Sequence, residues 1–148
     1  MPGQATLLSP QQLIEAAKAP ILAYNEKDWN AVKAAIAPDF TCDEVGTNRK
    51  VQGADQVITL WQAWAAAIPD SRATIHSALV SGSTVVLELT WQGTQTGALQ
   101  TPKGPIAPTG KRIEVRGCQI TEIVGEKPKV QRHYFDLTTL LQQIGATG

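Results

Sequence analysis

Residues 111–136, KRIEVRGCQITEIVGEKPKVQRHYFD, predict a long β-hairpin. The side chains of residues 111–124 alternate between an inner and an outer set, which is the period of a β-strand. The inner set is Ile113, Val115, Gln119, Thr121 and Ile123, and the outer set is Glu114, Arg116, Cys118 and Glu122. A turn over residues 125–128 then returns the chain as a last strand over residues 129–136.

The residues before this hairpin predict two more strands, over 73–80 and 84–95, joined by a turn at Gly82-Ser83. The second strand alternates in the same way as the hairpin. One face carries Val85, Leu87, Leu89 and Trp91, and the other carries Glu88, Thr90 and Gln92. Four long antiparallel strands are therefore expected in the second half of the chain.

The first half of the chain has the helical period instead. Ser9 and Pro10 predict the start of a first helix, which Pro20 is expected to kink or split. Asp28 predicts the cap of a second helix, and Gly53 the start of a third. The apolar positions of these three helices are Leu13, Ala17, Ile21, Tyr24, Trp29, Val32, Ile36, Val57, Leu60, Trp61, Trp64 and Ile68.

A short strand over residues 40–45 separates the second and third helices, and Asp136 is expected to cap a short closing helix. Helices that precede strands, rather than alternate with them, indicate an α+β fold. We expect one domain, residues 1–148, in which a curved antiparallel sheet wraps the helices as a half-open cone. The segment 94–110 lacks a period and predicts a mobile loop at the mouth of the cone.

The composition excludes several classes of function. Thirteen basic residues balance thirteen acidic ones, so no electrostatic footprint for nucleic acid is present. No apolar run is long enough to cross a membrane, and the first ten residues do not resemble a secretory signal, which together favour a cytoplasmic protein. Cys42 and Cys118 are expected to be buried free thiols. Two histidines without ligand spacing predict no metal, and no cofactor motif is present.

His133 is the first candidate for chemistry, because it shares a strand face with Phe135 and would point into the cone. An imidazole in an apolar cavity has a lowered pKa and stays neutral near pH 7, as a general base requires. Gln119 would orient His133 or hold a ligand carbonyl, and Glu44 could be a second acid or base. The predicted ligand-binding wall is Tyr24, Phe40, Trp61, Trp64, Trp91 and Phe135.

Each candidate also has a structural interpretation. His133 could be a core histidine that is hydrogen-bonded to Gln119 or Tyr24, and Glu44 could be a solvated residue where a loop starts. Aromatic stripes are commonly core, although in a cone fold the core wall is also the wall of the pocket.

Five segments of the chain resemble the SnoaL-like polyketide cyclases and ester cyclases of the nuclear transport factor 2-like superfamily. They are AYNEKDW (23–29), APDF (37–40), GTQTGAL (93–99), PTGKRIEVRG (108–117) and RHYFDLTTLLQQIG (132–145). The resemblance implies a cone fold of the cystatin-like type, a homodimer joined through the sheet and, in some members, cofactor-free acid/base chemistry on a carbonyl compound.

The resemblance also locates the family's catalytic residues. The family's aspartate base falls on His133 and its histidine partner on Gln119, so both residue types differ here. In the related steroid isomerase branch the catalytic aspartate falls near Glu44.

Three functions therefore stay open. The first is a cofactor-independent enzyme with isomerase, cyclase or hydrolase-like chemistry on a small apolar carbonyl or ester compound. The second is a non-catalytic domain that binds an apolar small molecule. The third, compatible with either, is association of two copies through the polar outer face of the sheet.

Overall fold

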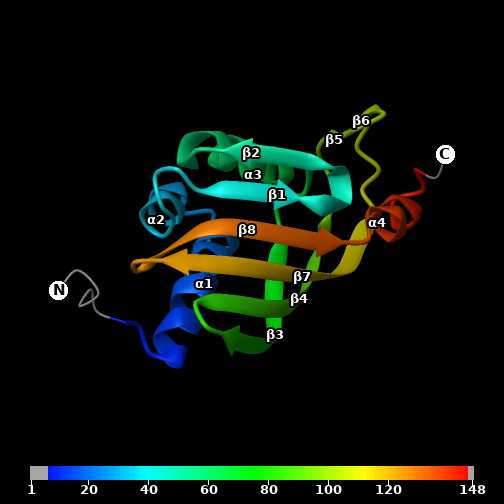
Figure 1. Ribbon diagram of the computed structural model, residues 1–148. Helices are drawn as coiled ribbons and strands as arrows, with labels where there is room; N and C mark the ends of the chain where they lie inside the picture. The colour runs from blue at the N-terminus through cyan, green and yellow to red at the C-terminus, as the bar shows by residue number, and fades with distance from the viewer. Residues whose placement is uncertain (1–6, 147–148) are drawn as a thin grey trace.

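The computed structural model describes residues 7–146 (Figure 1). The helices are α1 (Pro10–Asn25), α2 (Trp29–Ala34), α3 (Ala54–Ala67) and α4 (Leu137–Gln143), and a 3₁₀ turn lies at Val45–Thr47. The strands are β1 (Thr41–Glu44), β2 (Arg49–Gln52), β3 (Arg72–Ser81), β4 (Thr84–Thr94), β5 (Leu99–Thr101), β6 (Gly104–Ile106), β7 (Arg112–Val124) and β8 (Lys127–Phe135). The α+β fold class and the order of helices before long strands are confirmed.

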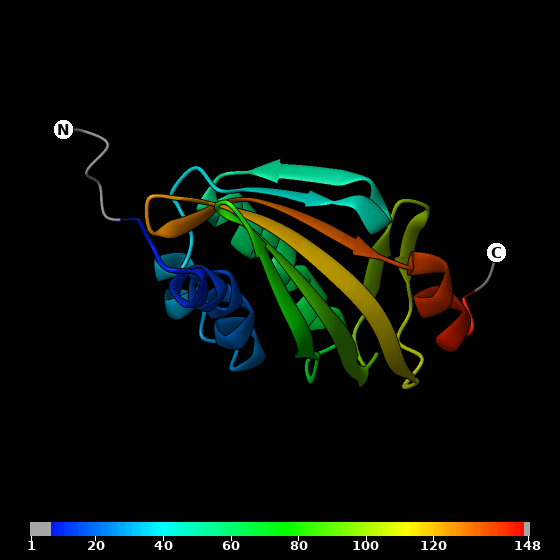
Figure 2. The same cartoon turned by 60° about the horizontal axis from the view of Figure 1, so that its bottom comes forward.

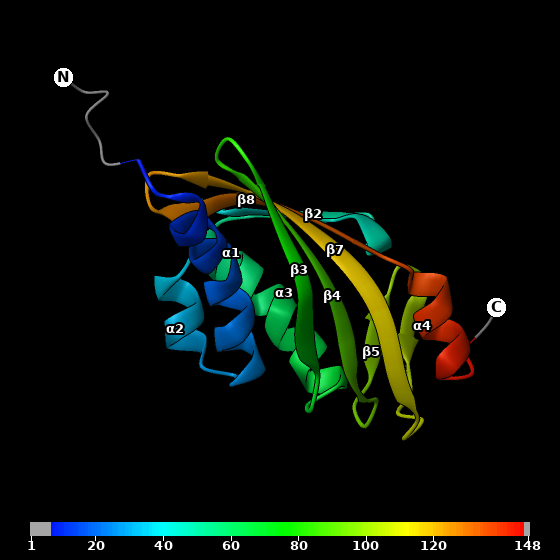
Figure 3. The same cartoon turned by 90° about the horizontal axis from the view of Figure 1, so that it is seen from below.

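Six strands form one curved sheet in the order β2-β1-β8-β7-β4-β3. The predicted antiparallel run is confirmed, because β3, β4, β7 and β8 pair antiparallel with one another in the order β3-β4-β7-β8. The sheet as a whole is mixed, however, since β1 pairs in parallel with β8. Figures 2 and 3 show the sheet curling around α3, with α1 and α2 beside it on the same concave side.

The helix ends follow the predicted capping residues. Ser9 caps α1 through a reciprocal pair of hydrogen bonds with Gln12, and the side chains of Asp28 and Asp136 cap α2 and α4. Pro20 was expected to kink or split the first helix, but α1 continues through it without a break. Proline has no backbone N–H, so Pro20 donates no hydrogen bond within the helix. Pro20 forms part of the wall of the cavity described below.

The segment 94–110 differs from the predicted structureless loop. It contains the β5–β6 hairpin, which packs on α3 through the buried Leu99. Gly97 makes this approach possible, since a Cβ at that position would lie 2.1 Å from the carbonyl oxygen of Ala66. The side chain of the buried Gln95 makes five hydrogen bonds within this segment, and these hold the chain on both sides of the hairpin in place. Alternation did not reveal the hairpin because its strands have only three residues each.

The sequence interpretation also missed β2, a strand of four residues beyond the 3₁₀ turn. Both cysteines are free, as expected, although Cys118 is only half-buried on the outer face. Burial raises the pKa of the Cys42 thiol to about 12, and the nearby negative charge of Glu44 acts in the same direction, so this thiol is a poor nucleophile at neutral pH. No helix within residues 7–146 is long and apolar enough to cross a membrane.

Candidate functional site

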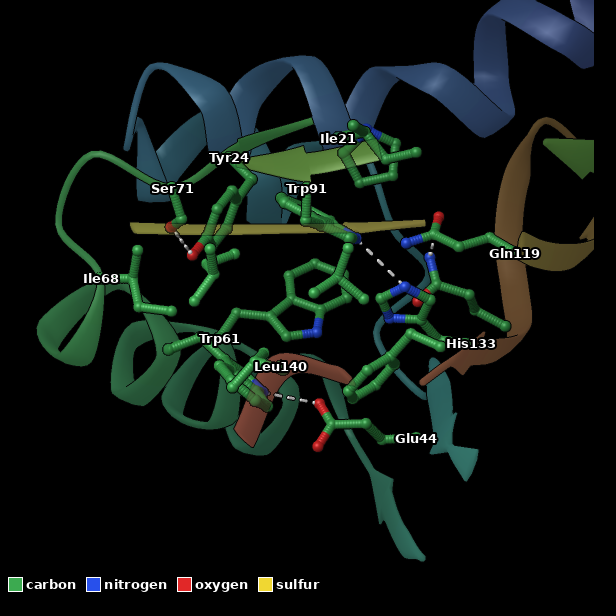
Figure 4. Close-up of a pocket in the computed structure, with 16 residues that line it drawn as sticks. Ile21, Tyr24, Glu44, Trp61, Ile68, Ser71, Trp91, Gln119, His133 and Leu140 are labelled. Carbon is green, nitrogen blue, oxygen red and sulfur yellow. Dashed lines mark hydrogen bonds between the residues drawn. The ribbon is translucent and has the colours of Figure 1, made fainter. Parts of the chain in front are cut away.

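A cavity lies between the concave face of the sheet and helices α1, α3 and α4 (Figure 4). It encloses about 710 Å³ of space free of atoms, a volume that includes its open mouth. Most of the lining is apolar or aromatic, as is typical of small-molecule sites. The lining residues are Pro20, Ile21, Tyr24, Glu44, Trp61, Trp64, Ile68, Ser71, Trp91, Ile113, Val115, Gln119, Gln131, His133, Phe135 and Leu140.

The three predicted catalytic candidates lie side by side across the sheet. His133 of β8 is directly opposite Gln119 of β7 on one side and Glu44 of β1 on the other. Because side chains at paired positions point to the same face of a sheet, all three project toward the cavity. The structure therefore brings together residues that are up to 89 positions apart in the chain.

The His133 ring has a defined tautomer, because Trp91 donates its indole Nε1–H to His133 Nε2 at 3.2 Å. An indole nitrogen is only a donor, so Nε2 must be the accepting nitrogen and the proton of the neutral ring is on Nδ1. The structural interpretation had His133 bonded to Gln119 or Tyr24, whereas the partner in the structure is Trp91. Gly117 leaves room for this contact, since a Cβ there would lie 3.1 Å from His133 Nε2.

The His133 ring is neutral at physiological pH. Burial lowers its pKa to about 4, against a smaller opposing effect of the Glu44 carboxylate. A ring with such a low pKa is a weak base, and its basic nitrogen already accepts the Trp91 proton. In this arrangement His133 is better suited to donate a hydrogen bond through Nδ1 than to remove a proton.

Gln119 is the second polar group of this end of the cavity and is 3% exposed. Its Oε1 accepts a bond from Gln131 Nε2 at 3.1 Å, and the oxygen of Gln131 faces the Cys42 thiol. Within the described chain, no hydrogen bond engages Gln119 Nε2, which therefore has its N–H groups available to a ligand.

Glu44 is not the solvated residue of the structural interpretation, because it is 2% exposed and forms part of the cavity wall. Its Oε1 accepts bonds from Thr47 Oγ1 and from the Arg49 guanidinium, at 2.8 Å to Nη2. Its Oε2 accepts the indole proton of Trp64 at 2.8 Å. The carboxylate is thus ion-paired on one oxygen, while the other keeps a lone pair beyond the one that Trp64 uses.

Tyr24 and Ser71 form a separate polar pair, away from His133 and Gln119 in Figure 4. The two hydroxyl oxygens are 2.6 Å apart, and both residues are buried, with Tyr24 5% and Ser71 6% exposed. Burial raises the pKa of Tyr24 to about 12, although the Ser71 hydroxyl opposes this, so the phenol keeps its proton.

Five of the six residues predicted for the ligand-binding wall line the cavity, and Phe40 does not. Phe40 is fully buried behind the wall, with its ring centre 6.0 Å from that of Trp61. Phe135 lies between His133 and Trp64, with ring centres 4.9 and 5.9 Å away. A Cβ on Gly46 would come within 2.9 Å of that ring, so a glycine makes room for it.

The sequence interpretation did not propose Ser71, Gln131 or Arg49 as site residues. Gln131 shares a strand face with His133, and this period alone would have placed it in the wall. Ser71 lies in the turn after α3 and Arg49 begins a strand of four residues, so neither belongs to a periodic pattern. Residues 7–146 contain no cluster of three or more His, Cys, Asp or Glu side chains placed to bind a metal ion.

Solved structures of several proteins share this fold. TsrD from Streptomyces laurentii matches with a TM-score of 0.81 and 22% identity, over 95% of this chain and 100% of its own. An LEH-like epoxide hydrolase of M. tuberculosis matches with a TM-score of 0.70 and 21% identity, over 90% of each chain. A Catenulispora acidiphila protein with a ketosteroid isomerase-like fold matches with a TM-score of 0.76 and 22% identity, over 90% of this chain and 94% of its own.

At these identities the solved structures show the fold alone. No curated protein matches the sequence. The family model described as SnoaL-like polyketide cyclase matches residues 14–144, which include every strand of the sheet and every residue of the cavity wall. The chain therefore belongs to the SnoaL-like polyketide cyclase family.

Proposed function

We propose that the cavity binds a small, mostly apolar molecule whose ketone oxygen accepts hydrogen bonds from His133 Nδ1 and Gln119 Nε2. The observation that supports this most directly is the Trp91 bond to His133 Nε2, which leaves Nδ1–H as the ring's only donor. In the part of the chain that the structure describes, no hydrogen bond uses either donor, and the two residues are opposite each other on paired strands.

The rest of the wall supports the same ligand chemistry. Three of the four tryptophans line the cavity, together with Phe135 and several aliphatic side chains. Such a surface stabilises an apolar body by about 25 cal/mol for each Å² removed from water. The two donors would then favour a ligand with an oxygen at one end, because unpaired donors in an apolar cavity penalise a pure hydrocarbon.

A matched pair of ligands tests this proposal. 2-Acetylnaphthalene and 2-isopropenylnaphthalene have almost the same shape, but only the first has a carbonyl oxygen. We expect the ketone to bind about 5- to 150-fold more tightly, because two neutral hydrogen bonds contribute about 1–3 kcal/mol together. Isothermal titration calorimetry measures both affinities, and quenching of the wall tryptophans reports that the ligand is in the cavity.

The variant His133→Phe keeps an aromatic ring but removes the Nδ1 donor. It should reduce the preference for the ketone to about threefold, while His76→Phe, a change at the exposed histidine, leaves the preference intact. Equal affinities of the ketone and the hydrocarbon for the unmodified protein would contradict the proposal.

A second candidate function is acid/base catalysis on the bound ketone. Glu44 favours it, because this buried carboxylate lines the same cavity next to His133 and keeps a free lone pair on Oε2. A carboxylate that removes a proton next to the carbonyl, while His133 and Gln119 donate to the oxygen, would produce an enolate without a cofactor. Cyclase-type and isomerase-type reactions both begin with this step.

Deuterium exchange distinguishes catalysis from binding alone. In D₂O the acetyl protons of 2-acetylnaphthalene exchange through the enolate, and proton NMR follows the loss of the methyl signal. If Glu44 is a base, the protein should accelerate exchange at least about tenfold over buffer, and Glu44→Gln should remove the acceleration. A rate equal to that of buffer, with the ketone shown to be bound, would leave binding as the function.

A further inference from the structure

We infer that the Tyr24–Ser71 pair is a second polar subsite, which holds a hydroxyl group at the opposite end of the same ligand. This inference rests on the proposed function, because it assumes that a ketone oxygen occupies the His133 end. The ligand class would then be an elongated apolar molecule with a ketone at one end and a hydroxyl at the other.

The hydrogen-bond capacity of the pair is the first argument. A tyrosine and a serine hydroxyl bring two protons, and the single bond between them uses only one, whichever oxygen donates. No other hydrogen bond of either hydroxyl exists within the described residues. One O–H and several lone pairs are therefore left over on two residues that line the cavity and are at most 6% exposed. A ligand hydroxyl can both accept that proton and donate to a lone pair.

The pair is also held rigidly in place. The Tyr24 ring makes edge-on contacts with Trp29 and Trp91, at centre distances of 5.6 and 5.3 Å. The Lys27 ammonium lies 4.5 Å from the centre of the same ring and donates to the backbone carbonyl of Ser71. A buried polar group fixed in this way binds a partner with little loss of side-chain entropy.

The position of Trp91 sets the length of the ligand. Its ring centre is 6.0 Å from that of His133 and 5.3 Å from that of Tyr24, and Figure 4 shows it between the two polar ends. A ligand lying along the indole would thus need a body about as long as the indole itself. A naphthalene with its two polar groups at positions 2 and 6 has this length.

Calorimetry with a second matched pair of ligands tests the subsite. 6-Acetyl-2-naphthol differs from 2-acetylnaphthalene only by a hydroxyl at the far end. We expect the naphthol to bind about tenfold more tightly to the unmodified protein. The double variant Tyr24→Phe/Ser71→Ala should reduce this ratio to about one.

Two further variants complete the design. Tyr24→Phe alone keeps the ring contacts with Trp29 and Trp91, so we expect it to fold even if the double variant does not, and it should lower the ratio to about threefold. Tyr134→Phe, at the other tyrosine of the chain, should leave the ratio unchanged because Tyr134 is exposed on the outer face. Circular dichroism verifies that each variant is folded.

The two ligand pairs separate the two proposals. If 2-acetylnaphthalene binds more tightly than its hydrocarbon analogue but the added hydroxyl gives no gain, the subsite is wrong and the ketone site stands. A gain that persists in the double variant also overturns the subsite. If the ketone shows no advantage over the hydrocarbon, the proposed function itself fails.

Discussion

The variant Glu44→Ala is expected to lower the free energy of unfolding by about 2–4 kcal/mol. The change removes the acceptor of the Trp64 indole proton and the counter-ion of Arg49, and it leaves a space beside the cavity. Arg49 is partly exposed and can turn to water, but the Trp64 N–H loses its partner inside the wall. Hydrogen bonds to charged groups contribute more than neutral ones, which is why the effect should be large.

Urea denaturation followed by circular dichroism measures this loss. Asp43→Ala is the matched control, because the neighbouring carboxylate points to the other face of β1 and should change stability by less than about 0.5 kcal/mol. The loss of stability in Glu44→Gln should lie between those of the two alanine variants, since an amide oxygen can still accept the hydrogen bond of the Trp64 indole. If Glu44→Ala and Asp43→Ala were equally stable, the polar cluster around Glu44 would not support the wall.

The second large effect concerns pH. The imidazole has a pKa of about 6.5 in the unfolded chain and about 4 in the folded protein. Between these values the unfolded state binds a proton that the folded state does not, so stability that is present above pH 6.5 falls as the pH falls. For one titrating group, the free energy of unfolding changes by at most about 1.4 kcal/mol per pH unit. We expect His133 to lower the free energy of unfolding by about 2–3 kcal/mol between neutral pH and pH 4.

Comparison with His133→Gln isolates this contribution, because glutamine has no proton to gain over this range. Between pH 7 and pH 4.5 the unmodified protein should lose about 2 kcal/mol more than the variant in urea titrations. His76→Gln should behave like the unmodified protein, as its side chain is exposed. Equal losses in all three proteins would mean that the His133 ring titrates normally.

The sequence was a good guide to the fold wherever a pattern was long. The strands β3, β4, β7 and β8 have 9 to 13 residues, so their alternation was visible, and the capping residues located the ends of the helices. The elements it missed, β2 and the β5–β6 hairpin, have three or four residues each and make no period. Their position depends on packing against α3 and β1.

Prediction of the site succeeded for residues on long strands. Alternation correctly placed His133, Gln119 and Trp91 on the inner face, but it could not show which of them are bonded. The Trp91–His133 bond arises from side-chain reach across two strand pairings, and that contact determines which nitrogen of the ring is free. Association of two copies through the outer face and a cytoplasmic location stay predictions.

The parallel pairing of β1 with β8 has a consequence for the order in which the molecule assembles. Most pairings in the large sheet join strands that follow each other in the chain, and only the β5–β6 hairpin separates β4 from β7. In contrast, β1 pairs with a strand that lies almost ninety residues further along the chain. Contacts this distant in sequence slow folding, and the early β1–β2 pair waits for its third strand. Glu44 and His133 meet only in this pairing, so the cavity would be completed in one of the last steps of folding.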